Sequence, residues 1–359
     1  MLASIRVQRR TPPTGGIVAS PDHSKSIQIQ LAERPSGWPT DDTFRTVTVD
    51  LPELGDGEVR VANEFVSVDP YMRGRMDDVK SYVPPYVLGE TMEGGAVGRI
   101  VASNSERLAV GDLVLHSLGW RDVAQGEASA FRKVEEIPGI TPSVYLGALG
   151  MPGFTAWVGL RKIARLREGD IVFVSGAAGA VGSSVGQIAR LAGASRVIGS
   201  AGSEEKVRTL TERYGFDAAF NYKEGPVRKS LREAAPDGID VYFDNVGGEH
   251  LEAALGAFRD GGRGAICGMI SQYNATEPAP GPRNLANLIK RGLTLQGFTV
   301  NRYNEHFKEF AAEVTPWVRS GELIYDETVV EGIENTPAAF LDMMHGANIG
   351  KMVVRVGRG

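Results

Sequence analysis

The residues of this sequence best suited to binding an anion are three glycines spaced three residues apart, Gly176, Gly179 and Gly182. Backbone amides that carry no side chain can approach a phosphate closely, and the N-terminus of a helix favours a negative charge. The spacing differs from the more common Gly-x-Gly-x-x-Gly, and a glycine run can also serve only to form a tight turn. If a strand precedes it and a helix follows it, the run predicts a site for the phosphates of a dinucleotide.

Small and basic residues further along indicate which dinucleotide this would be. An enzyme that uses NAD usually has an Asp or Glu after its second strand, which accepts a hydrogen bond from the ribose 2′-hydroxyl. Here that position is small and neutral, and the Ser203 hydroxyl, free amides and the Lys206 ammonium would suit a 2′-phosphate. These residues therefore favour NADP. The alternative is that Ser203 only caps a helix and that Glu205 binds the ribose.

Other polar and aromatic residues follow the expected strand ends, where ligands bind in open parallel sheets. Tyr222 and Lys223 could flank the adenosine phosphate, and Asn245 begins a tight turn beside the ligand groove. Tyr273 could donate a hydrogen bond to a substrate oxygen that becomes negative, since a phenol with a pKa of about 10 is protonated at neutral pH. It could equally be an aromatic residue of a surface loop. Cys267 is more typical of a small core residue than of a nucleophile.

The elements that must position these residues alternate between strands and helices from Gly147 onward. The uncharged run 171–175 is typical of a strand buried on both faces, and apolar residues recur at helical spacing after the glycines. This alternation implies right-handed crossovers and a six-stranded parallel sheet. The strands are expected near 170–175, 196–199, 218–222, 239–244, 263–267 and 293–298.

The chain before Gly147 has a different pattern. From Ser26 to about Phe131, short alternating strands are broken by Pro and Gly, which predicts a compact β barrel or sandwich. The tail ends in Lys351–Val356, a strand that could return to this first domain. Residues 1–24 lack the apolar core of a signal peptide, and we interpret them as a mobile extension or as the product of an upstream start codon.

Composition and charge exclude several classes of function. With 359 residues the chain can form two domains with full cores, and its net charge of −5 without a basic block argues against a nucleic-acid partner. No apolar run approaches the roughly 20 residues of a membrane span, so no membrane partner is expected. The single cysteine, Cys267, excludes an internal disulfide and fits a reducing cytoplasm. The five histidines are scattered, so no metal site is expected.

A set of separate motifs extends this interpretation. They are Val68-Asp69-Pro70-Tyr71-Met72-Arg73-Gly74-Arg75-Met76, Gly94-Gly95-Ala96-Val97-Gly98, Gly150-Met151-Pro152-Gly153, Ala178-Gly179-Ala180-Val181-Gly182, Gly202-Ser203-x-x-Lys206, Asn221-Tyr222, Asp244-Asn245-Val246-Gly247-Gly248, Ser271-Gln272-Tyr273-Asn274 and Asn348-Ile349-Gly350-Lys351. With them, the chain from about Ser24 onward resembles the medium-chain dehydrogenase/reductase superfamily, and within it the zinc-independent leukotriene B4 dehydrogenase/prostaglandin reductase-like group. That group includes plant double-bond reductases and bacterial curcumin reductase. The superfamily's zinc enzymes carry a Cys and a Gly-His-Glu ligand set, where this chain has Gly89-Glu90-Thr91-Met92, in agreement with a metal-free mechanism.

The resemblance implies an α/β fold with a GroES-like β-rich catalytic domain, formed by residues 25–150 and 322–359. A six-stranded parallel Rossmann domain that binds NADP, residues 151–321, is inserted between them, and a homodimer is expected. The family's substrate cleft lies between the domains, with Tyr71 and Tyr273 as the implied catalytic residues and Tyr273 over the nicotinamide. The implied NADPH contacts fall on Gly179, Ala180, Val181, Gly182, Lys206, Tyr222, Asn245, Cys267, Gly268, Met269, Ile270, Ser271, Tyr273, Phe298, Thr299, Val300 and Asn348.

These residues lead to one functional hypothesis and two alternatives. We expect NADPH-dependent reduction of the carbon–carbon double bond of a small-molecule enone or alkenal, with hydride transfer to the β-carbon. Donors such as the Tyr273 hydroxyl would stabilise the resulting enolate without a metal, and the α-carbon would take its proton from solvent or a tyrosine. An NADPH quinone oxidoreductase shares the fold and the cofactor, and a non-catalytic NADP(H)-binding protein is the other alternative. Residues 81–86 and 118–120 are expected to line the substrate pocket.

Overall fold

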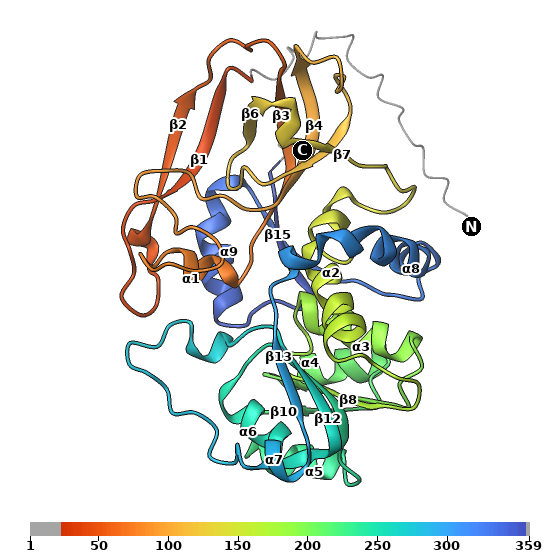
Figure 1. Cartoon of the computed structure of the whole chain (residues 1–359). Coiled ribbons are helices and arrows are strands. Elements are labelled where there is room, and N and C mark those ends of the chain that lie inside the picture. Colours follow the sequence, from red (N-terminus) through yellow and green to blue (C-terminus); the bar gives the residue numbers. More distant parts are fainter. Residues whose placement is uncertain (1–22, 357–359) are drawn as a thin grey trace, which may run out of the picture.

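Figure 1 shows the computed structural model, which describes residues 23–356. Within this range, six parallel strands form one sheet in the spatial order β10-β9-β8-β11-β12-β13. They are β8 (Ile171–Val174), β9 (Arg196–Ala201), β10 (Ala218–Asn221), β11 (Ile239–Asp244), β12 (Phe258–Ile266) and β13 (Thr294–Gly297). This order, with the first and fourth strands adjacent at the centre, is that of a dinucleotide-binding sheet. The predicted six-stranded parallel Rossmann sheet is confirmed.

Helices cover both faces of this sheet because its central strand is apolar throughout. Val172, Phe173 and Val174 of β8 are fully buried, so neither face of the strand can be left to solvent. Two of these side chains share a core with α2, α3 and α8, and Phe173 shares another core with α5 and α6. The helices of this part are α2 (Met151–Val158), α3 (Ala180–Leu191), α4 (Glu204–Arg208), α5 (Val227–Ala234), α6 (Gly248–Ala257), α7 (Asn287–Lys290) and α8 (Phe307–Ser320). No helix among residues 23–356 is both long and apolar enough to cross a membrane.

The β-rich part of the chain forms a second sheet, in which β14-β15-β3-β4-β5-β7 follow one another and β6 pairs with β3. Its elements, with the separate pair β1 and β2, are β1 (Lys25–Leu31), β2 (Phe44–Asp50), β3 (Glu58–Ser67), α1 (Tyr71–Arg75), β4 (Ala96–Ser103), β5 (Leu113–His116), β6 (Val123–Glu127), β7 (Arg132–Lys133), β14 (Glu327–Glu331), α9 (Thr336–Met344) and β15 (Lys351–Arg355). β15 pairs antiparallel with β3, so the tail returns to this part as the sequence predicted (Figure 1). The expected N-terminal extension lies almost entirely outside the described residues.

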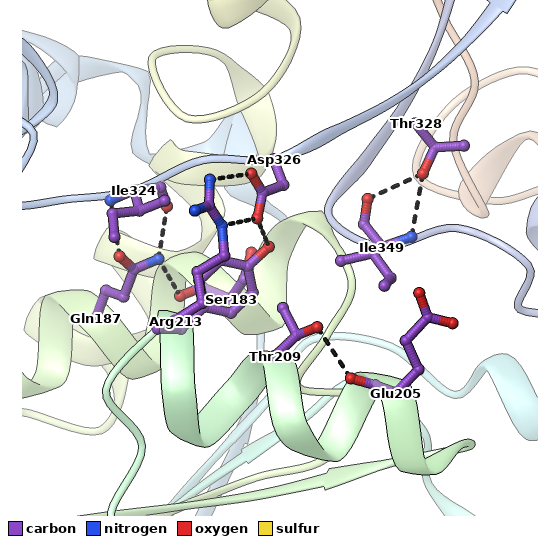
Figure 2. A network of polar contacts seen from close by, with 10 residues as sticks. Ser183, Gln187, Glu205, Thr209, Arg213, Ile324, Asp326, Thr328 and Ile349 are labelled. Atoms are coloured by element: carbon purple, nitrogen blue, oxygen red, sulfur yellow. Dashed lines mark hydrogen bonds and ion pairs between the residues drawn. The ribbon is translucent and has the colours of Figure 1, made fainter.

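The segment that leads from α8 back to the β-rich part is fixed on the helices beside the six-stranded sheet. Figure 2 shows Asp326 of this segment accepting two hydrogen bonds from Arg213, at 2.6 and 2.7 Å. Gln187 of α3 bonds both backbone groups of Ile324, at 2.7 and 2.8 Å. Four hydrogen bonds within a few residues therefore hold the two parts of the molecule against each other.

A second joint lies directly before β15. The Gly350 amide donates to the Ala178 carbonyl oxygen of the glycine turn at 2.8 Å. Gly350 has a φ of +66°, and a Cβ there would lie 1.9 Å from the Asp326 carbonyl oxygen. Only glycine therefore allows residue 350 to lie this close to Asp326. The tail thus contacts the glycine turn between β8 and α3.

Candidate active site

A cleft of about 1540 Å³ lies between the six-stranded sheet and the β-rich part of the chain. Most residues that the sequence assigned to a cofactor or to catalysis line it, although they come from distant segments. They are Tyr71, Gly179, Ala180, Val181, Gly182, Lys206, Tyr222, Asn245, Cys267, Gly268, Ile270, Ser271, Tyr273, Phe298, Thr299, Val300 and Asn348. Ser203 and Met269 are not among the residues that line the cleft.

One wall of the cleft is the turn between β8 and α3, residues 176–182, which we term the glycine wall. Gly179 is the N-cap of α3 and has no side chain that could occupy the first amides of the helix. A Cβ at Gly182 would lie 2.4 Å from the Gly176 carbonyl oxygen and 2.7 Å from Ala177 Cα, so only glycine fits here. The turn therefore presents bare backbone at a helix N-terminus, which fits the pyrophosphate of a dinucleotide.

Lys206 of α4 extends this wall beyond the end of β9. Its Nζ donates to the Gly346 carbonyl oxygen at 2.6 Å. Burial lowers the pKa of Lys206, and the nearby Lys223 lowers it further. Ser203 is the N-cap of α4 and accepts from the Lys206 amide at 3.3 Å, which is the alternative role that the sequence left open for it. Two lysines close together fit a phosphate group.

Tyr222 and His250 form the neighbouring surface. Their rings meet edge to face with centroids 5.2 Å apart. His250 is only 4% exposed, and its Nε2 is buried without a hydrogen-bond partner among the described residues. Burial lowers the pKa of His250 to about 4, so the ring is neutral at pH 7. The sequence showed His250 only as one of five scattered histidines, and no motif marks its contact with Tyr222.

The turn after β11 is held by Asp244, which is fully buried. Its Oδ1 accepts from the Tyr242 hydroxyl and from the Gly247 amide, each at 2.7 Å. Burial is the largest influence on this carboxyl and raises its pKa. Asn245, the next residue, donates to the Ser175 carbonyl oxygen at 2.8 Å and lines the cleft. The sequence predicted Asn245 as a cofactor contact but not the buried carboxyl that supports its turn.

A second wall consists of Tyr71, Tyr82 and Tyr273, which we term the tyrosine wall. Tyr71 lies in α1, Tyr82 in the loop that follows it, and Tyr273 directly after the 3₁₀ turn Ile270–Gln272. Burial raises the pKa of all three phenols, and that of Tyr273 rises to about 12 although a hydrogen bond from the Met269 backbone opposes the shift. The three hydroxyls are therefore protonated at neutral pH and can donate hydrogen bonds.

The two segments expected to line the substrate pocket contribute only in part. Tyr82 and Leu118 line the cleft. Tyr86 and Trp120 are instead 3% and 0% exposed and belong to the hydrophobic core of the β-rich part. The prediction is wrong for these two, because the sequence does not show which of several neighbouring aromatic side chains faces the core.

The cleft also contains residues that the sequence analysis did not single out. The rings of Trp38 and His345 stack with centroids 4.4 Å apart, and both residues line the cleft. Arg75 forms an ion pair of 2.7 Å with Glu93 at the cleft surface. Trp38 and His345 are far apart in the chain, and Arg75 and Glu93 belong to different elements, so no local pattern indicated either pair.

The chemistry available in the cleft is hydrogen-bond donation and phosphate binding. Burial raises the pKa of Cys267 to about 12, so its thiol is neutral and a poor nucleophile. Among residues 23–356 no group of three or more His, Cys, Asp or Glu side chains could hold a metal ion. The bare amides beside Gly182 and the ammonium of Lys206 fit a phosphorylated dinucleotide.

Comparison with known proteins agrees with this geometry. Residues 27–134 match a family described as the N-terminal domain of oxidoreductase, and residues 180–316 match a family described as zinc-binding dehydrogenase. The chain is 47% identical over 333 residues to the putative NADP-dependent oxidoreductase YfmJ of Bacillus subtilis (strain 168), covering 92% of this chain and 97% of the relative. It is 41% identical to the NADPH-dependent curcumin reductase of Escherichia coli (strain K12), covering 91% and 95%. The crystal structure of CurA from Vibrio vulnificus in complex with NADPH has a TM-score of 0.88 and 42% identity, over 93% of this chain and 100% of that one.

Proposed function

The chain belongs to the zinc-independent medium-chain dehydrogenase/reductases, in the group that includes curcumin reductase and prostaglandin reductase, and we propose that it uses NADPH to reduce the carbon–carbon double bond of α,β-unsaturated ketones and aldehydes. The observation that carries this proposal is the tyrosine wall, in which neutral phenols line the same cleft as the glycine wall. Donors of this kind suit a substrate whose oxygen becomes negative during the reaction.

NADPH would be held chiefly by backbone and by two lysines. The amides of residues 180–182 would face its pyrophosphate, and Lys206 with Lys223 would bind the 2′-phosphate. Asn245, Asn348 and the cleft-lining residues within 267–273 and 298–300 would hold the remaining parts. When bound, NADPH supplies a hydride to the β-carbon of the substrate.

Tyr273 stabilises the charge that reaches the carbonyl oxygen of the substrate. Because burial raises the pKa of its phenol to about 12, the hydroxyl is protonated at neutral pH and can donate a hydrogen bond as the charge develops. Tyr71 offers a second neutral hydroxyl from the β-rich part and narrows the space for water. The α-carbon takes its proton from solvent or from one of these tyrosines.

The proposal is tested by following NADPH oxidation with a straight-chain enone, an alkenal and a benzoquinone. With NADPH that carries deuterium at the transferred position, mass spectrometry and NMR should find a saturated ketone labelled at the β-carbon. Label at the carbonyl carbon would contradict double-bond reduction. Oxidation with the benzoquinone alone would indicate a quinone reductase, and tight NADPH binding without any oxidation would indicate a non-catalytic protein.

Three further expectations from the family remain proposals. The catalytic domain comprises residues 25–150 and 322–359 and the Rossmann domain residues 151–321, and the protein is a homodimer in the cytoplasm. The exposed edge strand β13 and the nearby Ile289, which is 88% exposed, support self-association, since an open sheet edge can pair with a second copy. Sedimentation equilibrium of the purified protein at micromolar concentration would measure the oligomeric state.

A further inference from the structure

The guanidinium of Arg73, in α1, is almost fully buried and connects three segments of the chain. It donates to the Gly37 carbonyl oxygen at 2.9 and 3.2 Å and to the Asp77 carboxylate at 2.8 Å, which are contacts within the β-rich part. Its Nε also donates to the Asn274 side-chain oxygen at 2.9 Å. The bond to Asn274 differs from the others because it reaches a loop that belongs to the six-stranded sheet.

That loop, residues 268–276, follows β12 but packs against the other part of the molecule. Ile270 and Tyr273 contact the same hydrophobic core as Tyr71 and α9. At Gly37, whose φ is +77°, a Cβ would lie 3.2 Å from the Thr276 methyl group, so the chain there approaches the loop closely. The loop therefore takes its position from the β-rich part as well as from the strand that it follows.

The bond also joins the two segments that carry the candidate catalytic tyrosines. Arg73 lies two residues after Tyr71, and Asn274 directly follows Tyr273. A hydrogen bond between these neighbours limits how far the two phenols can separate. An oxyanion site loses much of its effect when a donor is displaced by about 1 Å, so such a restraint matters for catalysis.

We propose that Arg73 and Asn274 are positioning residues that hold the Tyr273 hydroxyl in its working place relative to Tyr71. This inference rests on the proposed function, because it assumes that Tyr273 donates to the substrate oxygen. Arg73 does not line the cleft, and Asn274, which does, acts here through its bond to Arg73 rather than by contact with the substrate. Their effect is carried through the backbone of the 268–276 loop.

Asn274 is the better position to test, because removing the buried Arg73 would leave Asp77 and the Gly37 carbonyl without their donor and could unfold α1. The Asn274→Ala variant should lower kcat about tenfold, since it removes a hydrogen bond to a charged group, while the Kd for NADPH stays within about twofold. The Asn274→Asp variant keeps an acceptor for the guanidinium and should retain kcat. Asn304→Ala, an exposed asparagine outside the cleft, is the matched control.

A double-mutant cycle separates positioning from a general loss of structure. If Asn274 acts through the Tyr273 hydroxyl, Asn274→Ala should cause no further fall in kcat beyond about twofold in the Tyr273→Phe background. A fall of the same factor in both backgrounds would overturn the inference. An unchanged kcat in Asn274→Ala alone would overturn it as well.

Hydrogen exchange of the NADPH complex gives a readout that does not depend on turnover. Amides 270–275 should exchange about tenfold faster in Asn274→Ala than in the wild type or in Asn304→Ala. Unchanged exchange would contradict the inference even if the enzyme reduces enones. Faster exchange in a protein that reduces no enone would instead refute the proposed function and leave the restraint of this loop established.

Discussion

The two walls of the cleft are built in opposite ways. The glycine wall is backbone from one continuous turn, and its shape depends on the absence of a Cβ at Gly182. The tyrosine wall consists of side chains from α1, the loop after it and the loop after β12. Adding a Cβ to the glycine wall would therefore distort its backbone. In the tyrosine wall, by contrast, hydrogen-bond donation would be lost when a hydroxyl is removed or a loop shifts.

This difference assigns the two walls different tasks. In the proposed reaction, amides fixed by a strand and a helix would bind the phosphates of the cofactor, which do not change during the reaction. Of the three phenols, those of Tyr82 and Tyr273 are carried on loops, from two parts of the molecule, and loops can adjust when a substrate enters. Binding of the cofactor and stabilisation of the reacting oxygen should therefore respond to separate substitutions.

The largest effect is expected from removing one oxygen atom from the tyrosine wall. Tyr273→Phe should lower kcat about 10²–10³-fold, the usual cost of losing a donor to a developing oxyanion, with little change in the Kd for NADPH. Steady-state kinetics with an enone and fluorescence titration with NADPH measure the two quantities. Tyr303→Phe, at a tyrosine outside the cleft, is the control. Wild-type turnover in Tyr273→Phe would remove Tyr273 from the reaction.

The second effect comes from adding one carbon atom to the glycine wall. Gly182→Ala places a Cβ 2.4 Å from the Gly176 carbonyl oxygen, which cannot move without disturbing the turn. We expect the free energy of unfolding to fall by about 1–3 kcal/mol and the Kd for NADPH to rise about tenfold. Urea unfolding and calorimetry measure these changes. Gly225→Ala, where a Cβ would meet no atom within 4 Å, should change neither, and equal behaviour of the two variants would contradict the close-approach argument.

The contrast between the walls also explains what could be predicted from the sequence. The strand, the glycine turn and the helix of the glycine wall lie within one segment, so the local pattern predicted the fold there and was enough to propose a phosphate site. The tyrosine wall could be proposed only from motifs of the family, because Tyr71 and Tyr273 line one cleft only in the folded chain. Local patterns did not indicate that Tyr86 and Trp120 face the core, that His250 lies against Tyr222, or that Trp38 stacks on His345. Each of these facts depends on a partner far away in the chain.

A smaller effect is expected at the edge of the glycine wall, where a side chain rather than backbone would bind the cofactor. Lys206→Ala should weaken the preference for NADPH over NADH about fivefold, since a half-buried charge-assisted contact contributes about 1 kcal/mol. The ratio of kcat/KM for the two cofactors is the measurement. Lys229→Ala, on the exposed face of α5, is the control. An unchanged ratio in Lys206→Ala would contradict the role of this lysine in binding the 2′-phosphate.

The smallest expected effect is the pH dependence of kcat and of KM for NADPH, which should differ between the two walls. The pKa of Tyr273 is raised to about 12, so its donating form is complete at every pH well below that value. We therefore expect kcat for an enone to change by less than about twofold between about pH 7 and 9. Burial and Lys223 lower the pKa of Lys206, so its charge is lost at a lower pH than that of an ordinary lysine, and KM for NADPH should rise towards the alkaline end. In Lys206→Ala this rise in KM should be smaller while kcat stays level. The variant removes a titrating group beside the glycine wall and leaves the tyrosine wall unchanged. A fall of kcat with a midpoint near neutral pH would show that the phenols of the tyrosine wall are not all protonated over this range. That result would contradict the separate roles proposed for the two walls.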